Sequence, residues 1–333
     1  MEQNLHADRA GSGGRDNGFA AFFDREIAPA LAEVERQRSR RMLLVYELGG
    51  LGLFAGAGVF VATATDMHAI LGISRNLLQI SCFAVMFGSL LAAFFAYRAL
   101  YRRFKGVLAG KVAAYRGLEY RTGGFEFPLE RFEPLLPYHR SHRLEDRLAG
   151  AHKGVDIELC EGRFKRPGAK DKKDKTVFNG LLLSYSFPKP FSAQTVVLPD
   201  HGAVGNLLER MRQEGDPVQL EGLAFEDRFE VYSTGKLEAF RLLTPAFMEK
   251  IEALAAHFGT KRGLALAFLE NRLLITVRRN RTNDQFESGH LFRPVADWPE
   301  RARKVDAQIA AMLDVVDVLN IAAADKKQEG ASR

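Results

Sequence analysis

The chain has 333 residues, of which 47% are hydrophobic, and a formal net charge of +6. This length allows one or two domains in addition to the long apolar stretches near the N-terminus. Two cysteines, Cys82 and Cys160, exclude a disulfide framework and fit a reducing compartment. The basic residues gather beside the apolar stretches, so the positive charge is poor evidence for a nucleic-acid partner.

The N-terminal region divides into a tail and a helix. Residues 1–18 are polar and rich in glycine, which predicts a disordered tail. Residues 19–41 form an expected amphipathic juxtamembrane helix, because apolar residues recur at steps of three and four from Phe19 to Val34. Pro29 predicts a break or kink in that helix.

Residues 42–100 are predicted to form a transmembrane helical hairpin with spans at about 42–65 and 76–98. Leu48–Thr65 is a run of 18 residues without a charge, and Asn76–Tyr97 is a second run of 22. A helix rises about 1.5 Å per residue, so each run can cross a hydrocarbon core of about 30 Å.

Charge predicts the orientation of this hairpin. One cation, Arg75, lies between the spans, whereas eight cations flank them on the other side, namely Arg36, Arg38, Arg40, Arg41, Arg98, Arg102, Arg103 and Lys105. The positive-inside rule therefore places both termini in the cytoplasm. No cleavable signal peptide is expected, because the first apolar run follows a long polar segment.

Small residues recur along both spans at helical spacing. We expect them to let the two helices approach closely, since membrane helices associate through small residues. The predicted packing residues are Gly52, Gly56, Ala84, Gly88, Ala92 and Ala96. The alternative is that glycine and alanine are simply common in membrane helices.

The rest of the chain is predicted to be an α+β protein with a mostly antiparallel sheet. Residues 101–149 are expected to be a helical and extended connector, with a short helix near Ser141–Leu148. The segment 150–296 is the expected cytoplasmic α+β domain. Within it, Thr244 and Pro245 predict a helix start, Gly259 predicts its end, and Glu270-Asn271 predicts a hairpin turn.

Residues 297–324 are predicted to form a C-terminal helix, followed by a disordered tail at 325–333. Its apolar residues follow a heptad spacing through Val305, Ile309, Met312, Val316, Leu319 and Ala323. Such a narrow seam favours a helical partner, which we expect to be residues 19–40 or the extension of the second span. The alternative is a coiled coil between protomers, which would make the protein a homo-oligomer.

Several segments occur in an order that resembles a known family. They are LEYRTGGF from Leu118, FNGLLLSYSFPKPFSAQTVVLPD at 178–200, LEGLAFEDRFEVYST at 220–234 and RLLTPAFMEKIEAL at 241–254. Together with the hairpin they resemble the bacterial membrane protein family of unknown function DUF3137. The resemblance implies a bacterial inner-membrane protein with a cytoplasmic α+β domain, and it supplies no activity, cofactor or catalytic residue.

No catalytic motif is found, and no cofactor or metal is predicted. His139, His142 and Asp146 would share one face of a helix, but their spacing lacks the pattern of a zinc enzyme and arginines surround them. Nucleic acid is not expected as a partner, because no recognition motif appears and aromatic residues do not alternate with the basic ones.

Two basic stretches are candidates for contact with anionic lipid or with a partner protein. They comprise Lys165, Arg166, Lys170, Lys172, Lys173, Lys175, Arg278, Arg279 and Arg281. The alternative is an exposed loop that charge keeps soluble.

The sequence therefore favours a membrane-anchored interaction or regulatory protein, whose partners are the lipid bilayer and another protein. The alternatives are a membrane-bound enzyme at the cytoplasmic surface and an accessory subunit of a transport assembly. A polar pocket with perturbed carboxylates or histidines would favour the enzyme. A ring of subunits around a wet lumen would favour transport.

Overall fold

The computed structural model describes the chain in nine stretches. These are residues 18–65, 72, 74–168, 173–187, 189–200, 214–220, 223–260, 263–279 and 298–319. The two expected tails lie outside them, apart from Gly18, as do most of the loop between the apolar helices and the helix expected near residues 205–213.

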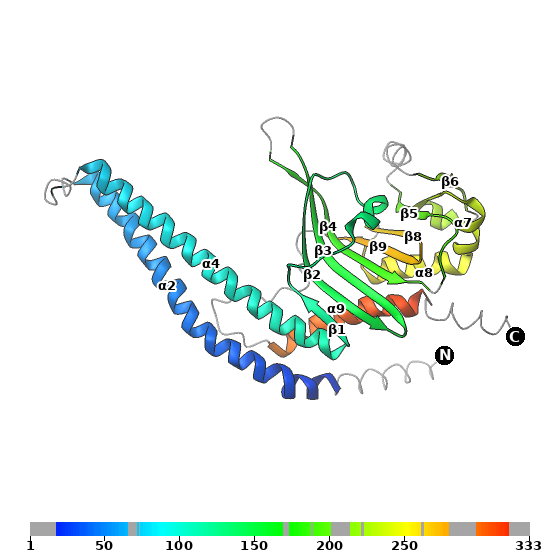
Figure 1. Ribbon diagram of the computed structural model, residues 1–333, viewed down its shortest axis with the longest axis horizontal. Helices are drawn as coiled ribbons and strands as arrows, with labels where there is room; N and C mark the ends of the chain where they lie inside the picture. Colours follow the sequence, from blue (N-terminus) through cyan, green and yellow to red (C-terminus); the bar gives the residue numbers. More distant parts are fainter. Residues whose placement is uncertain are drawn as a thin grey trace. The chain divides into compact units, whose positions relative to one another are not determined.

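The chain divides into two compact units. The first contains Met1–Lys111 and Glu287–Ala302, and the second contains Val112–Phe286 and Arg303–Arg333. Helices and strands are labelled as in Figure 1. The helices are η1 (Phe23–Ile27), α2 (Ala28–Ala64), α4 (Arg75–Tyr115), η2 (Leu129–Leu135), α6 (Leu223–Glu226), α7 (Lys236–Leu242), α8 (Pro245–His257) and α9 (Trp298–Val318).

In the first unit, α2 and α4 lie side by side as a hairpin (Figure 1). Buried side chains from both helices pack together, among them Val34, Met42, Leu100 and Phe104. Trp298, at the start of α9, stacks on Phe104 with ring centroids 5.2 Å apart. The hairpin is therefore held by a continuous apolar contact at the end that is farthest from its loop.

The helix continues through Pro29 instead of breaking there. A proline inside a helix lacks an N–H and leaves the carbonyl four residues earlier without its helical partner. The structure has the five-residue π-helix η1 immediately before α2 begins, with Pro29 in the first turn of α2. The local irregularity therefore takes the form of a single π-helical turn at the start of the long helix.

Away from their mutual contact, α2 and α4 expose large apolar side chains. Leu53, Phe54 and Phe60 have 74%, 80% and 72% of their surface exposed. Only 11% of the most apolar 18-residue window of each helix is buried. By length and composition, both helices are capable of crossing a membrane.

The second unit contains an antiparallel sheet of nine strands in the described residues, in the order β1-β2-β3-β4-β9-β8-β5-β7-β6 (Figure 1). The strands are β1 (Leu118–Arg121), β2 (Ser141–His152), β3 (Val155–Arg166), β4 (Lys175–Ser186), β5 (Thr195–Pro199), β6 (Asp216–Val218), β7 (Phe229–Ser233), β8 (Leu264–Leu269) and β9 (Arg272–Arg278). The predicted α+β class with an antiparallel sheet is confirmed.

Different elements cover the two faces of the sheet. On one face, Phe132 and Leu135 of η2 pack in a core with Leu182 of β4 and Ala267 of β8. Their strand neighbours point to the opposite face, because side chains alternate along a strand. There, Phe268 of β8 contacts Phe247 of α8, with ring centroids 5.9 Å apart.

The helix and the hairpin expected near the C-terminal end of the domain are both present. α8 begins at Pro245 after Thr244, and Gly259 beyond its end has a φ of +61°. A left-handed conformation at this position is typical of helix termination. Leu264–Leu269 and Arg272–Arg278 pair across a turn in which Glu270 has a φ of +55°.

The prediction of a short helix near Ser141–Leu148 is wrong. These residues belong to β2, which pairs with β3 along its whole length. The register shifts between Glu145 and Leu148, and Asp146 adopts a φ of +56°. Such a bulge breaks the alternation of side chains, so the sequence shows no strand period. The sheet consequently begins at Leu118, inside the stretch that was expected to be a connector.

The C-terminal helix was expected to pack against residues 19–40 or the extension of the second span, and within the second unit it contacts the sheet, the helix α8 and Arg116, the residue after α4. Met312 accepts a hydrogen bond from Tyr185 of β4, and Ala311 lies 3.2 Å from His257 of α8. Leu313 and Val315 are buried beside the predicted seam, which makes the apolar stripe broader than a heptad pattern. Packing against residues 19–40 stays a prediction.

Candidate functional site

A cavity of about 600 Å³ opens on the face of the sheet that η2 covers. This volume falls within the range of pockets that hold small ligands or short peptide segments, about 300–1,000 Å³. Its lining residues are Glu130, Glu133, Pro134, Leu136, Pro137, Tyr138, His139, Gln194, Glu214 and Leu269.

The 3₁₀ geometry of η2 positions the acidic side of this cavity. A 3₁₀-helix has three residues per turn, so residues three apart share a face. Phe132 and Leu135 share the buried face and anchor η2 in the core. Glu130 and Glu133 share a different face and line the cavity. Pro134 limits the backbone of the same segment.

The cavity combines negative charge with apolar surface. Glu130, Glu133 and Glu214 contribute three carboxylates, and neither lysine nor arginine is among the described lining residues. Leu269 and the exposed ring of Tyr138 supply apolar surface. A group that joins a positive charge to an apolar part would complement this lining.

The residues weighed as a metal site do not gather as one. The rings of His139 and His142 lie 6.0 Å apart, and His139 Nδ1 is 3.1 Å from the carbonyl oxygen of Pro137. Asp146 instead accepts a hydrogen bond of 2.6 Å from the hydroxyl of Tyr120. Among the described residues, no three His, Cys, Asp or Glu side chains are arranged to hold a metal.

The described thiol of the second unit is unsuited to nucleophilic chemistry. Cys160 is fully buried in the core beneath η2. Burial, reinforced by the nearby Glu158 and Glu161, raises the pKa of the Cys160 thiol well above its usual range. The thiolate, which is the reactive form, is therefore suppressed.

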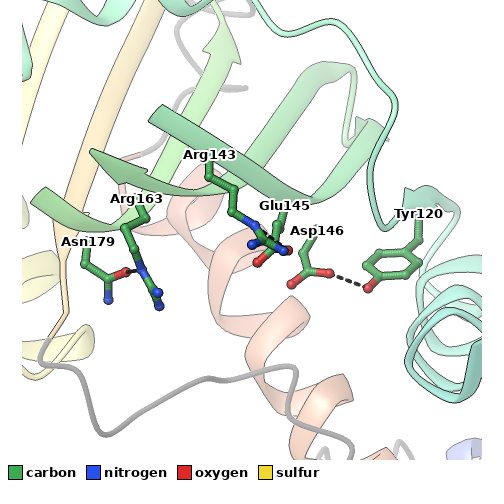
Figure 2. Close-up of polar contacts among 6 residues, drawn as sticks. All are labelled: Tyr120, Arg143, Glu145, Asp146, Arg163 and Asn179. Atoms are coloured by element: carbon green, nitrogen blue, oxygen red, sulfur yellow. Dashed lines mark hydrogen bonds and ion pairs between the residues drawn. The ribbon is translucent and has the colours of Figure 1, made fainter. Parts of the chain in front are cut away.

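A row of polar residues crosses β2, β3 and β4 on the opposite face of the sheet (Figure 2). Arg143 and Arg163 stand directly opposite each other on β2 and β3, and Asn179 stands opposite Arg163 on β4. Arg143 donates from Nε to Glu145 at 2.9 Å, and Arg163 donates from Nε to the side-chain oxygen of Asn179 at 3.2 Å. Sequence analysis missed this row, because only strand register brings its members together.

The bulge in β2 adds a buried carboxylate to the same row. Asp146 is 1% exposed, and Figure 2 shows it beside Glu145 with Tyr120 aimed at it. Successive residues usually alternate between faces, but a bulge turns neighbouring side chains to the same side. The Tyr120 hydroxyl thereby donates to a buried carboxyl oxygen and ties β1 to β2.

The predicted basic residues have different surroundings in the structure. Lys165, Arg166, Lys173 and Lys175 are exposed near the tip of the β3–β4 hairpin. Arg279 forms an ion pair with Glu161 at 3.2 Å, and its side chain is 10% exposed. Arg278 lies over the ring of Phe178. Lys170, Lys172 and Arg281 lie outside the described residues.

The predicted small residues fall into two groups. A Cβ on Gly52 would come within 2.8 Å of Leu90 and Ser89, and a Cβ on Gly56 within 3.0 Å of Met86, so both glycines lie at the contact between α2 and α4.

The ridge on the second helix differs from the expectation. Ala84, Gly88 and Ala92 are exposed on α4, and a Cβ on Gly88 would meet nothing within 4 Å. Ala96 is half-buried and packs against the core of the hairpin. The contact face of α4 instead follows Ser89, Ala93 and Leu100, which are buried.

The described residues define a class of protein: two long apolar helices joined to an antiparallel α+β domain. Residues 176–321 match the model of a family described as a protein of unknown function (DUF3137), which confirms the resemblance to that family. No curated protein matches the chain in sequence.

Among solved structures, similarity is found to the crystal structure of the mycobacterial trehalose monomycolate transport factor A, TtfA. The identity is 13%, the match covers 65% of this chain and 97% of that chain, and the TM-score is 0.34. A likeness at this level supports no argument about the fold or function of this chain.

Proposed function

We propose that the protein is an integral protein of the bacterial inner membrane that presents its α+β domain to a protein partner in the cytoplasm. The observation behind the membrane anchor is the exposure of large apolar side chains along α2 and α4, such as Leu53, Phe54 and Phe60. Contiguous apolar surface of this extent is unfavourable in water, whereas a bilayer buries it.

The orientation of the anchor follows from the arginines at the ends of the two helices. The proposal places both termini in the cytoplasm and the loop near Gly72 on the far side. A reporter that is active only outside the cytoplasm should be silent when it is fused after Arg333 and active when it is inserted at Gly72. The reverse pattern would contradict the orientation.

The cavity beneath η2 is the proposed contact for the protein partner. Its three carboxylates and apolar wall complement a segment that has a basic residue next to an apolar one. Such a contact suits an interaction module, and it requires no reaction at the site.

The cavity contact is testable by site-specific photo-cross-linking in cells. A photoreactive residue in place of Tyr138, which is 74% exposed at the cavity, should cross-link one partner. The double change Glu130→Gln and Glu133→Gln should reduce that cross-link, because it removes two of the three carboxylates. Glu249→Gln, an exposed change on α8, is the matched control and should leave the cross-link intact. An unchanged cross-link in the double variant would contradict the proposal.

The exposed cations of the β3–β4 hairpin are a second proposed contact, to anionic lipid or to an acidic partner surface. Lys165, Arg166, Lys173 and Lys175 form this group. Each basic residue near an anionic bilayer contributes about 1 kcal/mol. High salt should therefore weaken this contact through screening.

A further inference from the structure

The row of polar residues in Figure 2 contains one exposed arginine, Arg163, that forms no ion pair with a carboxylate of the described residues. Three arginines lie in or beside this row, together with three carboxylates; they are Arg143, Arg163, Arg279, Glu145, Glu161 and the buried Asp146. Glu145 binds Arg143, and Glu161 binds Arg279. Arg163 has no carboxylate partner among the described residues, and its recorded bond goes to the neutral amide of Asn179.

The strand register places a second arginine directly opposite Arg163. Arg143 and Arg163 are directly opposed residues on adjacent antiparallel strands. Like charges at such positions destabilise a sheet, and opposite charges stabilise it. An anion bound at Arg163 would therefore replace a repulsion with an attraction.

The geometry leaves several donors for such an anion. Arg163 uses Nε to reach the oxygen of Asn179, so both terminal nitrogens of its guanidinium group remain available. Because the amide oxygen of Asn179 faces Arg163, its amide nitrogen faces away, and Figure 2 shows that nitrogen and the guanidinium tip extending in the same direction. Lys165 follows on the same face of β3, about 7 Å along the strand.

We propose that Arg163, Asn179 and Lys165 form a binding site for a phosphate group. A fork of two guanidinium N–H groups matches two phosphate oxygens, and such charge-assisted bonds are about twice as strong as neutral ones. A planar carboxylate has only two oxygens, whereas a phosphate has a further oxygen for the Asn179 amide or for Lys165. The source of the phosphate is either a lipid headgroup or a soluble phosphate compound. The site lies on the sheet face opposite the cavity and does not depend on the proposed protein contact.

The test uses the full-length protein in phosphatidylcholine nanodiscs, titrated with inorganic pyrophosphate by calorimetry. Saturable binding is expected, and Arg163→Gln should weaken it about tenfold, since one charge-assisted pair is lost. Lys236→Gln is the matched control: it removes one positive charge from an exposed residue of α7 that belongs to neither this row nor the other proposed contacts. It should change the affinity less than about twofold.

Asn179→Asp separates a binding role from a structural one. It places a carboxylate beside Arg163 with almost no change in shape, so it should raise the thermal midpoint while it abolishes binding of the anion. A purely structural Arg163 would gain stability in this variant without any loss of pyrophosphate binding.

A second arm identifies the source of the phosphate. Nanodiscs that contain phosphatidylglycerol are compared with phosphatidylcholine nanodiscs, for the wild type and for Arg163→Gln. A gain in thermal stability that depends on Arg163 in the anionic nanodiscs supports a lipid headgroup, and binding of pyrophosphate alone supports a soluble ligand. The proposal is overturned if neither probe depends on Arg163, or if Lys236→Gln loses as much binding as Arg163→Gln.

Discussion

Tyr185 of β4 donates its hydroxyl hydrogen to the backbone carbonyl oxygen of Met312 in α9, at 2.9 Å across 127 residues of sequence. The phenol is completely buried, and burial raises the pKa of Tyr185 well above its usual range. One hydrogen bond thus joins the centre of the sheet to the helix that covers it. It also makes the stability of the second unit sensitive to alkaline pH.

Tyr185→Phe should cost about 1 kcal/mol of unfolding free energy near neutral pH, because the variant loses one buried hydrogen bond. The cost should shrink above pH of about 10, the ordinary pKa of tyrosine. There the unfolded wild type releases the phenolic proton while the folded state retains it, so the wild type loses stability as pH rises. Urea unfolding of both proteins at neutral pH and at high pH measures the difference.

The ionisation of Cys160 does not affect the comparison between the wild type and Tyr185→Phe. Burial raises its pKa as well, but the thiol is present in both proteins and affects both equally. A stability difference that stays constant or grows at high pH would show that Tyr185 does not retain its proton in the folded state.

Arg116 and Asp306 form a bidentate ion pair that holds α9 in the second unit. Arg116 donates from two nitrogens to the two oxygens of Asp306, both at 2.6 Å, and the pair is largely shielded from solvent. The hydrogen bonds with Asp306 raise the pKa of Arg116, so its guanidinium group stays positively charged. Asp306→Ala should cost about 2–3 kcal/mol, because it leaves a partly buried guanidinium without its partner.

Asp317→Ala is the matched control on the same helix. Asp317 pairs with Lys153 at 2.5 Å, but both side chains are about half exposed. Exposed pairs contribute about 0–1 kcal/mol, because solvent screens them and two long side chains lose freedom. Equal losses in thermal unfolding for Asp306→Ala and Asp317→Ala would contradict a larger contribution from the shielded Arg116 pair than from the exposed Lys153 pair.

Strong local signals explain the elements that could be predicted. The long uncharged runs predict two long apolar helices, which the structure contains as α2 and α4. The Thr244-Pro245 start and Gly259 end specify α8 through backbone chemistry alone. β2 was not predicted, because the bulge at Asp146 interrupts the alternation of side chains by which a strand is recognised in a sequence. The small residues of α4 illustrate a further limit: helical spacing places Ala84, Gly88 and Ala92 on one face, but spacing does not say which face meets α2.

The candidate sites were harder to predict from the sequence than the fold was. Glu130 and Glu214 line the same cavity from segments that are distant in the chain, and no local motif joins them. The prolines near η2 indicated an irregular segment in the sequence. They did not indicate that a 3₁₀-helix would place Glu130 and Glu133 on one face of that segment. Arg163 became a candidate only when the register showed which arginines have acidic partners.

Ile251→Ala tests the packing of α8 on the sheet. Ile251 is completely buried on the same helix face as Leu254, as the spacing of apolar residues predicts. Truncation should cost about 2–5 kcal/mol, because it removes apolar contacts and leaves a cavity. Glu249→Ala, two residues away on the exposed side, should change the stability by less than about 0.5 kcal/mol. Similar midpoints of chemical unfolding for the two variants would contradict the observed packing.

The last prediction compares two glycines of the hairpin. Gly52→Leu should weaken the contact between α2 and α4, because even a Cβ there would lie 2.8 Å from Leu90 and Ser89. Gly88→Leu should leave the contact unchanged, because nothing lies within 4 Å of its Cβ position. Both changes improve helix propensity by about 1 kcal/mol, so the difference between them reports packing alone.

The measurement is the thermal midpoint of each full-length variant in mild detergent, with size-exclusion chromatography to follow the oligomeric state. The wild type and Gly88→Leu should behave alike, and Gly52→Leu should unfold at a lower temperature, since close helix approach depends on small residues. Equal losses for both variants would mean that α4 meets a second helix through its exposed ridge as well as α2. Equal stability of all three proteins would mean that the helices do not approach closely at Gly52.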